Sequence, residues 1–195
     1  MVDGARLLLV RHGRHDWLYP PINRFAGHLP GVHLNADGRV EAGALSRRLQ
    51  TSPPDRIVSS PVERAVETAT IIAETLGRAV TTDERITETG MGSWEGLPVP
   101  EVIARFPAQW HAWRTAPTTA DIPGMEKVEA IGARMLTAAV DYLEQGGATL
   151  LVSPYSVNCD TTRAEPPTSS TDRLSFPASS SKIRRWAIFC ASIAA

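Results

Sequence analysis

The sequence has few cysteines, almost no net charge and no long apolar run. Its 195 residues include two cysteines, Cys159 and Cys190, which are too few for a disulfide framework. Lys and Arg number 20 against 21 Asp and Glu, and this balance argues against a protein that holds nucleic acid by bulk charge. No apolar run reaches the roughly 18 residues of a membrane helix, and the apolar stretch near the N-terminus is too short for a signal peptide. We therefore expect a cytoplasmic protein with neither a nucleic-acid partner nor a membrane partner.

The composition divides the chain into two parts. The length predicts one domain, and a hydrophobic content of 43% is enough for a core. Between residues 161 and 181, however, ten of 21 residues are Ser or Thr and three more are Pro, a composition typical of loops or disorder. We therefore predict a coherent domain over residues 1–153. Residues 154–195 are expected to be an atypical C-terminal segment of the same domain, in part disordered.

The hydrophobic pattern predicts alternating strands and helices. Three short apolar runs, at residues 7–10, 56–59 and 148–153, are typical of strands buried on both faces. Helical periodicity predicts helices at residues 37–49, 61–76, 100–113 (interrupted at Pro107) and from about 125 to 145. This order predicts an α/β fold, a three-layer sandwich whose mostly parallel central sheet is flanked by helices. The apolar residues 186–195 favour a packed terminal strand or helix over a membrane anchor.

The helix after the second strand has a start signal in its sequence. Ser60 suits the N-cap, Pro61 suits the first helical position, and Glu63 completes a capping box. Arg64 then falls in the first helical turn.

Polar residues with phosphate chemistry follow the predicted strands. Arg11 and His12 end the first strand, and Arg64 opens the helix after the second. Ligands of open α/β sheets bind beyond the carboxyl ends of the strands. Arginine forks match phosphate oxygens, a helix N-terminus favours anions, and a neutral imidazole can attack phosphorus. The pattern favours phosphoryl chemistry.

Four segments, in order, resemble the histidine phosphatase superfamily, which includes the cofactor-dependent phosphoglycerate mutases. Residues 10–13 (VRHG) resemble its RHG signature, and residues 59–69 (SSPVERAVETA) resemble its S-S-P-x-x-R-A-x-E-T-A helix start. Residues 88–96 (ETGMGSWEG) resemble its E-x-x-x-G-x-W-E-G segment, and residues 123–126 (PGME) resemble its P-G-G-E segment. The resemblance covers roughly residues 5–153 and implies the fold expected above.

The resemblance also implies roles for individual residues. His12 would be the nucleophile that becomes phosphohistidine, and Arg11 and Arg64 would clamp the phosphoryl oxygens. Glu88 would be the general acid for the leaving oxygen and then the base that activates water. Glu84 and Glu95 lie near Glu88 in sequence and compete for that role. The reaction needs no metal and no other cofactor, and the expected partner is a small phosphorylated metabolite or phosphate.

The sequence departs from the family at two places. The family has a second catalytic histidine after a strand, but here Pro154 follows the matching strand, and no histidine occurs after His111. The loss of one transition-state donor typically costs about 10² to 10³ in rate. In the first motif, His15 replaces the usual threonine, and we interpret it as a loop or surface residue. Asn23 and Arg24, in the loop that follows, are candidates for substrate binding beside Arg11 and Arg64.

Three functions remain open at this point. The first is a phosphomonoester hydrolase that works through phosphohistidine on a small phosphorylated substrate. The second is a catalytically impaired phosphate-binding or interaction protein of the same fold, which Pro154 favours. The third is a phosphoglycerate mutase-like phosphotransferase, which the short spacing of 66 positions between Glu88 and Pro154 disfavours. The sequence carries no signal for the oligomeric state.

Overall fold

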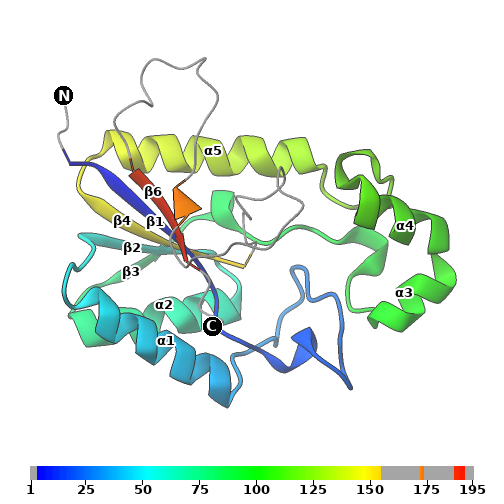
Figure 1. The fold of residues 1–195 in the computed structure, drawn as a ribbon, viewed down its shortest axis with the longest axis horizontal. Helices are drawn as coiled ribbons and strands as arrows, with labels where there is room; N and C mark the ends of the chain where they lie inside the picture. The colour runs from blue at the N-terminus through cyan, green and yellow to red at the C-terminus, as the bar shows by residue number, and fades with distance from the viewer. Residues whose placement is uncertain (1–3, 155–171, 174–186, 192–195) are drawn as a thin grey trace.

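The computed structural model describes residues 4–154, 172–173 and 187–191, and its centre is a six-stranded sheet (Figure 1). The strand order is β3-β2-β4-β1-β6-β5. All neighbouring strands pair in parallel except β5, which is antiparallel to β6. The strands are β1 (Arg6–Arg11), β2 (Arg56–Ser59), β3 (Val80–Thr82), β4 (Ala148–Ser153), β5 (Asp172–Arg173) and β6 (Ala187–Ala191).

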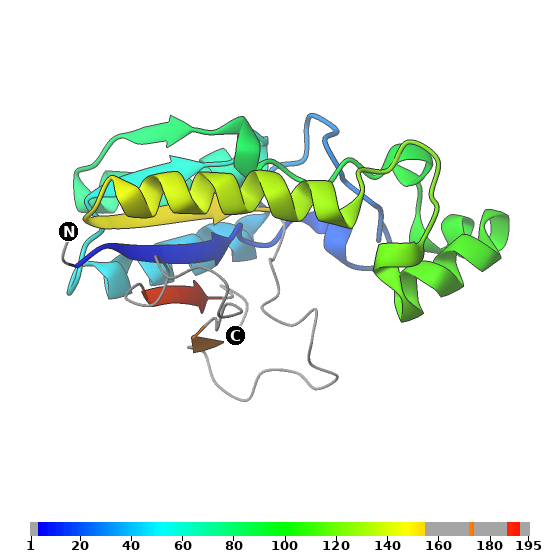
Figure 2. The ribbon, with the colours of Figure 1, turned by 90° about the horizontal axis from the view of Figure 1, so that it is seen from above.

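Helices cover both faces of the sheet. Helices α1 (Ala36–Leu49) and α2 (Glu63–Leu76) lie together on one face, and α5 (Val128–Glu144) crosses the other (Figures 1 and 2). The expected three-layer α/β sandwich with a mostly parallel sheet is therefore confirmed.

Alternate residues of the central strands belong to two separate cores. Val10, Ile57 and Leu150 pack with α2, whereas Leu7, Val58 and Leu151 pack with α5. Because side chains alternate along a strand and helices cover both faces, every position in these strands favours an apolar residue. This explains why the strands read as continuous apolar runs.

A third cluster, rich in aromatic residues, lies beyond the carboxyl edge of the sheet. Its helices are α3 (Val99–Arg105) and α4 (Pro107–Thr115), with 3-10 turns η3 (Gly92–Trp94) and η4 (Pro117–Thr119). In Figure 2 the arrows of β1 (blue) and β4 (yellow) point toward the side of the molecule that carries these helices. Trp94 is fully buried there, and Trp110 and Trp113 pack against it at centroid distances of 6.1 and 5.9 Å. Trp110 and Trp113 therefore pack against this cluster.

Three local predictions for the start of α2 were wrong: Ser60 as the N-cap, Pro61 as the first helical residue, and a capping box completed by Glu63. Helix α2 begins at Glu63 with Val62 as the N-cap, so Ser60 and Glu63 form no capping box. The Glu63 carboxylate accepts a hydrogen bond from the Gly31 N–H instead (3.0 Å). A tertiary contact thus replaced the local one, and the chain follows an extended path to Val62 before the helix begins.

The C-terminal strand β6 pairs in parallel with β1, from Arg6↔Ala187 to Val10↔Ala191. The apolar C-terminus therefore contributes a strand to the sheet, one of the two predicted alternatives. The stretch 161–181, apart from residues 172–173, lies outside the described residues, so the division at residue 153 stays a prediction. Among the described residues, no helix has the length and apolar character to cross a membrane.

Candidate functional site

The strand register brings three chain segments to one edge of the sheet. Arg11 pairs with Ser153, and Ser59 pairs with Val152. The residues that follow, including His12 and the buried Pro154, therefore lie beyond the carboxyl ends of β1, β2 and β4. This is the edge at which α/β sheets bind ligands.

His12 is buried, with 4% of its surface exposed, and its ring is held from both sides. Its Nδ1 lies 2.7 Å from the carbonyl oxygen of Gly13, and its Nε2 lies 3.3 Å from Nε of Arg64. A carbonyl can only accept, so Nδ1 carries the proton. Burial and the Arg64 guanidinium hold the pKa of His12 well below its usual 6.5. The ring is therefore neutral, with its lone pair on Nε2.

Arg64 is the residue that connects the parts of the site. Its side chain is 1% exposed, and besides His12 it contacts the carbonyl oxygen of Gly27 (3.0 Å) and Oε2 of Glu88 (3.1 Å). Burial lowers the pKa of Arg64, while Glu88 opposes that shift. Since the ordinary pKa of arginine is above 12, the group remains a cation.

A hydroxyl bridge fixes the strand end relative to the helix. Thr68 donates to the carbonyl oxygen of Arg64 (2.7 Å) and accepts from the N–H of Gly13 (3.1 Å). Gly13 also packs so tightly against α1 that an added Cβ would lie 2.4 Å from the oxygen of Gly38. These contacts with α1 and α2 fix the backbone beside His12.

Glu88 is held through its backbone as well as its side chain. Its Oε1 accepts from the N–H of Thr89 (2.8 Å), while its carbonyl oxygen accepts from Nη2 of Arg134 (3.1 Å). Arg134, on α5, also donates to the carbonyl oxygens of Arg85 and Thr87 and forms a two-pronged ion pair with Glu126. The segment before Glu88 is therefore anchored to α5 by one guanidinium. Spacing alone did not signal Arg134 or Thr68 as part of the site.

His15 lies in the loop after β1, as one of the two predicted alternatives has it, but it is not at the surface. It is 2% exposed, and its ring centroid lies 5.2 Å from that of His12. Burial, followed by Arg64 and Arg11, lowers the pKa of His15 to about 4. The chain turns back toward the sheet directly after β1, and this tertiary path could not be read from the local pattern of glycines and prolines.

We expect the free energy of unfolding, in phosphate-free buffer, to fall as the pH is lowered from 7 to 5. The pKa of His15 is about 4 in the folded chain against an ordinary 6.5, so the unfolded chain takes up a proton first. The contribution of neutral His15 to the free energy of unfolding is complete above pH 6.5 and is lost as the pH falls toward 4. At pH 5 the loss is about 2 kcal/mol. Urea unfolding at pH 7 and pH 5 measures this loss.

Two variants test the assignment to His15. His15→Asn should remove this part of the pH dependence, and the exposed His111→Asn should keep it. Equal dependence of the free energy of unfolding on pH in both variants would contradict the prediction.

The four predicted catalytic residues lie near one another. His12, Arg64 and Glu88 are joined by contacts, and Arg11 is close enough to lower the pKa of both histidines. Of the competing glutamates, Glu95 accepts instead from the N–H of His28. Their catalytic roles stay predictions.

Asn23 and Arg24 lie in a different environment. The carbonyl oxygen of Asn23 accepts from the N–H of Val99 (2.8 Å), and Nη1 of Arg24 donates to the carbonyl oxygen of Gly96 (2.9 Å). These contacts tie their loop to the segment that leads into α3. A substrate-binding role for Asn23 and Arg24 stays a prediction.

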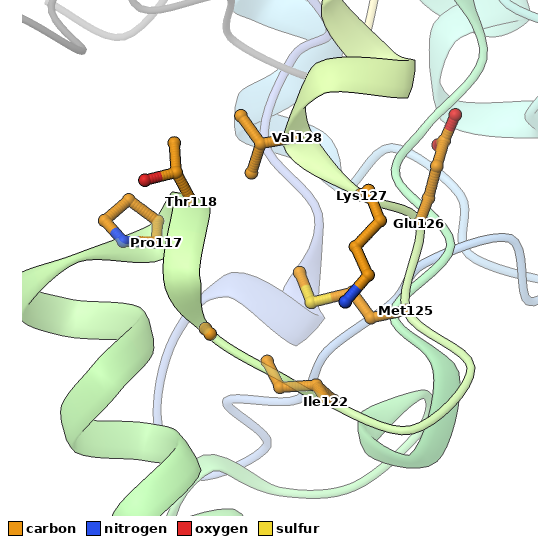
Figure 3. Close-up of a pocket in the computed structure, with 8 residues that line it drawn as sticks. Pro117, Thr118, Ile122, Met125, Glu126, Lys127 and Val128 are labelled. Atoms are coloured by element: carbon orange, nitrogen blue, oxygen red, sulfur yellow. The ribbon is translucent and has the colours of Figure 1, made fainter.

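A small surface pocket lies between η4 and the start of α5 (Figure 3). Its lining is mostly apolar, and Lys127 beside it is paired with Asp121 (3.1 Å). The pocket is lined by Pro117, Thr118, Ala120, Ile122, Met125, Glu126, Lys127 and Val128. It is therefore separate from the His12 site. Among the described residues, no group of three or more His, Cys, Asp or Glu side chains is arranged to hold a metal ion.

Known proteins are similar to this chain in sequence and in fold. Phosphoserine phosphatase 1 of Hydrogenobacter thermophilus is 32% identical over 131 residues, and glucosyl-3-phosphoglycerate phosphatase of Mycobacterium tuberculosis is 36% identical over 146 residues. These alignments cover 67% and 73% of this chain and 61% and 64% of the two relatives. The chain thus spans a little over three fifths of the length of these curated relatives.

Solved structures agree with the sequence relatives. The native structure of the mycobacterial glucosyl-3-phosphoglycerate phosphatase is 31% identical and superposes with a TM-score of 0.66, covering 74% of this chain and 71% of that one. YhfR of Bacillus stearothermophilus is 28% identical with a TM-score of 0.70, covering 77% and 74%. The family model described as histidine phosphatase superfamily (branch 1) matches residues 7–157. This chain, which carries that family's motifs at one edge of its sheet, belongs to the histidine phosphatase superfamily.

Proposed function

We propose that this protein is a phosphomonoester hydrolase that works through a phosphohistidine at His12 on a small phosphorylated substrate. The observation that carries the proposal is the buried, neutral His12, whose Nδ1 is bonded to Gly13 and whose Nε2 faces Arg64. In the free site the Nε2 lone pair accepts a hydrogen bond from Nε of Arg64; when a phosphoryl group takes the guanidinium, that lone pair is released for in-line attack on phosphorus.

The proposed reaction proceeds in two steps. In the first, Nε2 of His12 forms a bond to phosphorus as the bond from phosphorus to the leaving oxygen breaks, and Glu88 gives that oxygen a proton. In the second, Glu88 takes a proton from water, whose oxygen attacks phosphorus and releases His12 and inorganic phosphate. Arg11 and Arg64 balance the charge on the phosphoryl oxygens in both steps.

The contact between Arg64 and Glu88 fits this exchange of roles. In the free site, the carboxylate of Glu88 is paired with Nη2 of Arg64 (3.1 Å). A bound phosphoryl group competes for the same guanidinium, and its negative charge favours the protonated carboxyl. Substrate binding thus prepares Glu88 to act as an acid. Once the leaving group has gone, the carboxylate can act as the base.

Relatives support a small phosphorylated substrate. Two of them are named as phosphatases of phosphoserine and of glucosyl-3-phosphoglycerate, and the mycobacterial enzyme has been solved in complex with inorganic phosphate. A second candidate, a phosphate-binding protein without turnover, is favoured by the buried Pro154 at the end of β4.

Rapid mixing with p-nitrophenyl phosphate, phosphoserine and 3-phosphoglycerate separates the candidates. We expect a burst of acid-labile, base-stable phosphoenzyme followed by steady release of inorganic phosphate. Phosphate binding with neither phosphoenzyme nor release would instead support the binding protein. Movement of phosphate to a second hydroxyl, seen by phosphorus NMR, would support a phosphotransferase.

A further inference from the structure

Three buried nitrogen atoms at the carboxyl end of β1 have neither a hydrogen-bond partner nor an ion-pair partner within the described part of the chain; a fourth, Nε of Arg14, is paired with Glu41 (2.8 Å). The three atoms are Nε of Arg11, Nδ1 of His15 and Nη1 of Arg64. They come from the strand end, the loop that follows and the first turn of α2. Buried polar atoms are normally satisfied, so neighbouring orphans need an explanation. A ligand with several acceptor oxygens would supply partners for all three.

His15 is the member of this group that the proposed reaction does not use. Its side chain is 98% buried, because only 2% of its surface is exposed. Its ring lies 5.2 Å from the ring of His12 at an interplanar angle of 45°. Arg64 and Arg11 are near enough to act on its charge. A histidine that served only to fill space here would be a poor choice, since a buried nitrogen without a partner is costly.

We propose that His15 contacts the substrate, donating a hydrogen bond from Nδ1 to an oxygen of the transferred phosphoryl group. This proposal rests on the proposed function, since the phosphoryl group is the one that Arg11 and Arg64 would hold for attack by His12. His15 then supplies a second imidazole from the β1 side of the site. The β4 side ends at Ser153 and Pro154, and proline has no side-chain donor.

The two imidazoles take different roles because their Nδ1 atoms differ in their hydrogen-bond partners. In His12 the Nδ1 proton is used by the carbonyl oxygen of Gly13, so Nε2 keeps its lone pair for phosphorus. In His15 it is Nδ1 that is buried without a partner, and with its proton there the ring is a donor. A donor facing the anion cannot attack it. His15 therefore stabilises the charge that develops on the phosphoryl oxygens.

The neutral state of His15 in the free protein fits this role. Burial and the two arginines disfavour the imidazolium in the empty site. A phosphate dianion would offset the arginine charges and strengthen the hydrogen bond from His15. Binding of the anion should therefore change the ring of His15 directly.

Nitrogen NMR of histidine-labelled protein tests the contact without relying on turnover. On titration with inorganic phosphate, we expect the ring signals of His15 to shift with the same dissociation constant as those of His12. The exposed His111 on α4 provides the control, and its signals should not move. Unchanged His15 signals at phosphate concentrations that saturate the shift of His12 would overturn the proposal.

Three substitutions locate the donor atom. The amide nitrogen of Asn can occupy the position of Nδ1, whereas that of Gln reaches the position of Nε2. We expect His15→Asn to bind inorganic phosphate within about threefold of the unsubstituted protein, and His15→Gln and His15→Leu to bind about 10- to 100-fold more weakly, the range for one hydrogen bond to a charged group. Tight binding by folded His15→Leu would overturn the proposal. If the leucine variant does not fold, the contrast between Asn and Gln decides.

The two proposals fail in different ways. If the unsubstituted protein shifts the His15 signals with phosphate but releases none from any phosphomonoester, the proposed hydrolase is wrong and the His15 contact stands. If phosphate release is steady and both His15→Gln and His15→Leu retain full phosphate affinity and rate, the hydrolase stands and the His15 contact is wrong.

Discussion

Replacing His12 with asparagine is expected to lower phosphate release from p-nitrophenyl phosphate by about 10³-fold or more and to abolish the phosphoenzyme. Asparagine keeps a donor for the carbonyl oxygen of Gly13 and so preserves the local backbone. It has no atom at the position of Nε2, which lies 3.3 Å from Nε of Arg64. The substitution therefore removes the nucleophile while sparing most of the packing around it.

His111→Asn is the matched control for that experiment. His111 is exposed on α4, and the same chemical change there should leave phosphate release within about twofold of the unsubstituted protein. Phosphoenzyme that still forms in His12→Asn would place the nucleophile elsewhere. Unchanged release in His12→Asn would contradict the proposed function itself.

Arg64→Lys is expected to lower kcat/KM by about 10² to 10³ although it keeps the positive charge. The guanidinium of Arg64 reaches His12, Gly27 and Glu88 at once, through nitrogens fixed in one plane. A lysine offers one flexible ammonium and cannot occupy those positions together. A lysine would also lose the contact with Glu88 that, in the proposed reaction, positions its carboxyl near the leaving oxygen. Inorganic phosphate should bind more weakly to this variant in calorimetry.

Arg39→Lys provides the matched arginine control. Arg39 is exposed and pairs with Glu67 across α1 and α2 at 2.8 Å. Exposed pairs of this kind contribute at most about 1 kcal/mol, so this change should leave kcat/KM unaltered. A folded Arg64→Lys variant that matches Arg39→Lys in kcat/KM would show that the geometry of the fork is not needed.

The sequence was informative wherever structure is set by simple periodicity or by position in the sheet. Continuous apolar runs predicted β1 and β4, because strands covered on both faces have no polar side. The helical stripe after Ser60 predicted α2, and the break at Pro107 between α3 and α4 was correctly placed. The rule that parallel strands bind ligands at their carboxyl ends then predicted that His12 and Arg64 would meet.

Sequence patterns were less informative where a residue forms a contact with a distant part of the chain in place of a local one. The capping box at Ser60 failed because Glu63 bonds to Gly31 instead. In the helix predicted at residues 37–49, hydrophobicity alone does not identify the inner face, since Val40 is 68% exposed whereas Ala42 and Ser46 are buried. Gly38 explains which face of α1 is buried, because its close approach to Gly13 orients α1 against the loop after β1.

The sequence by itself determined the sandwich and the residues of the proposed phosphoryl site, since strand periodicity and motif order are local properties of the chain. Only the tertiary structure decided that His15 is buried beside His12, that Arg64 pairs with Glu88, and that Arg134 holds the backbone of Glu88 from α5. The contacts of Glu88 with Arg64 and Arg134 join segments that are far apart in the chain and meet only when the layers pack. Buried charged and polar groups need hydrogen-bond partners, and the fold decides which partners lie within reach.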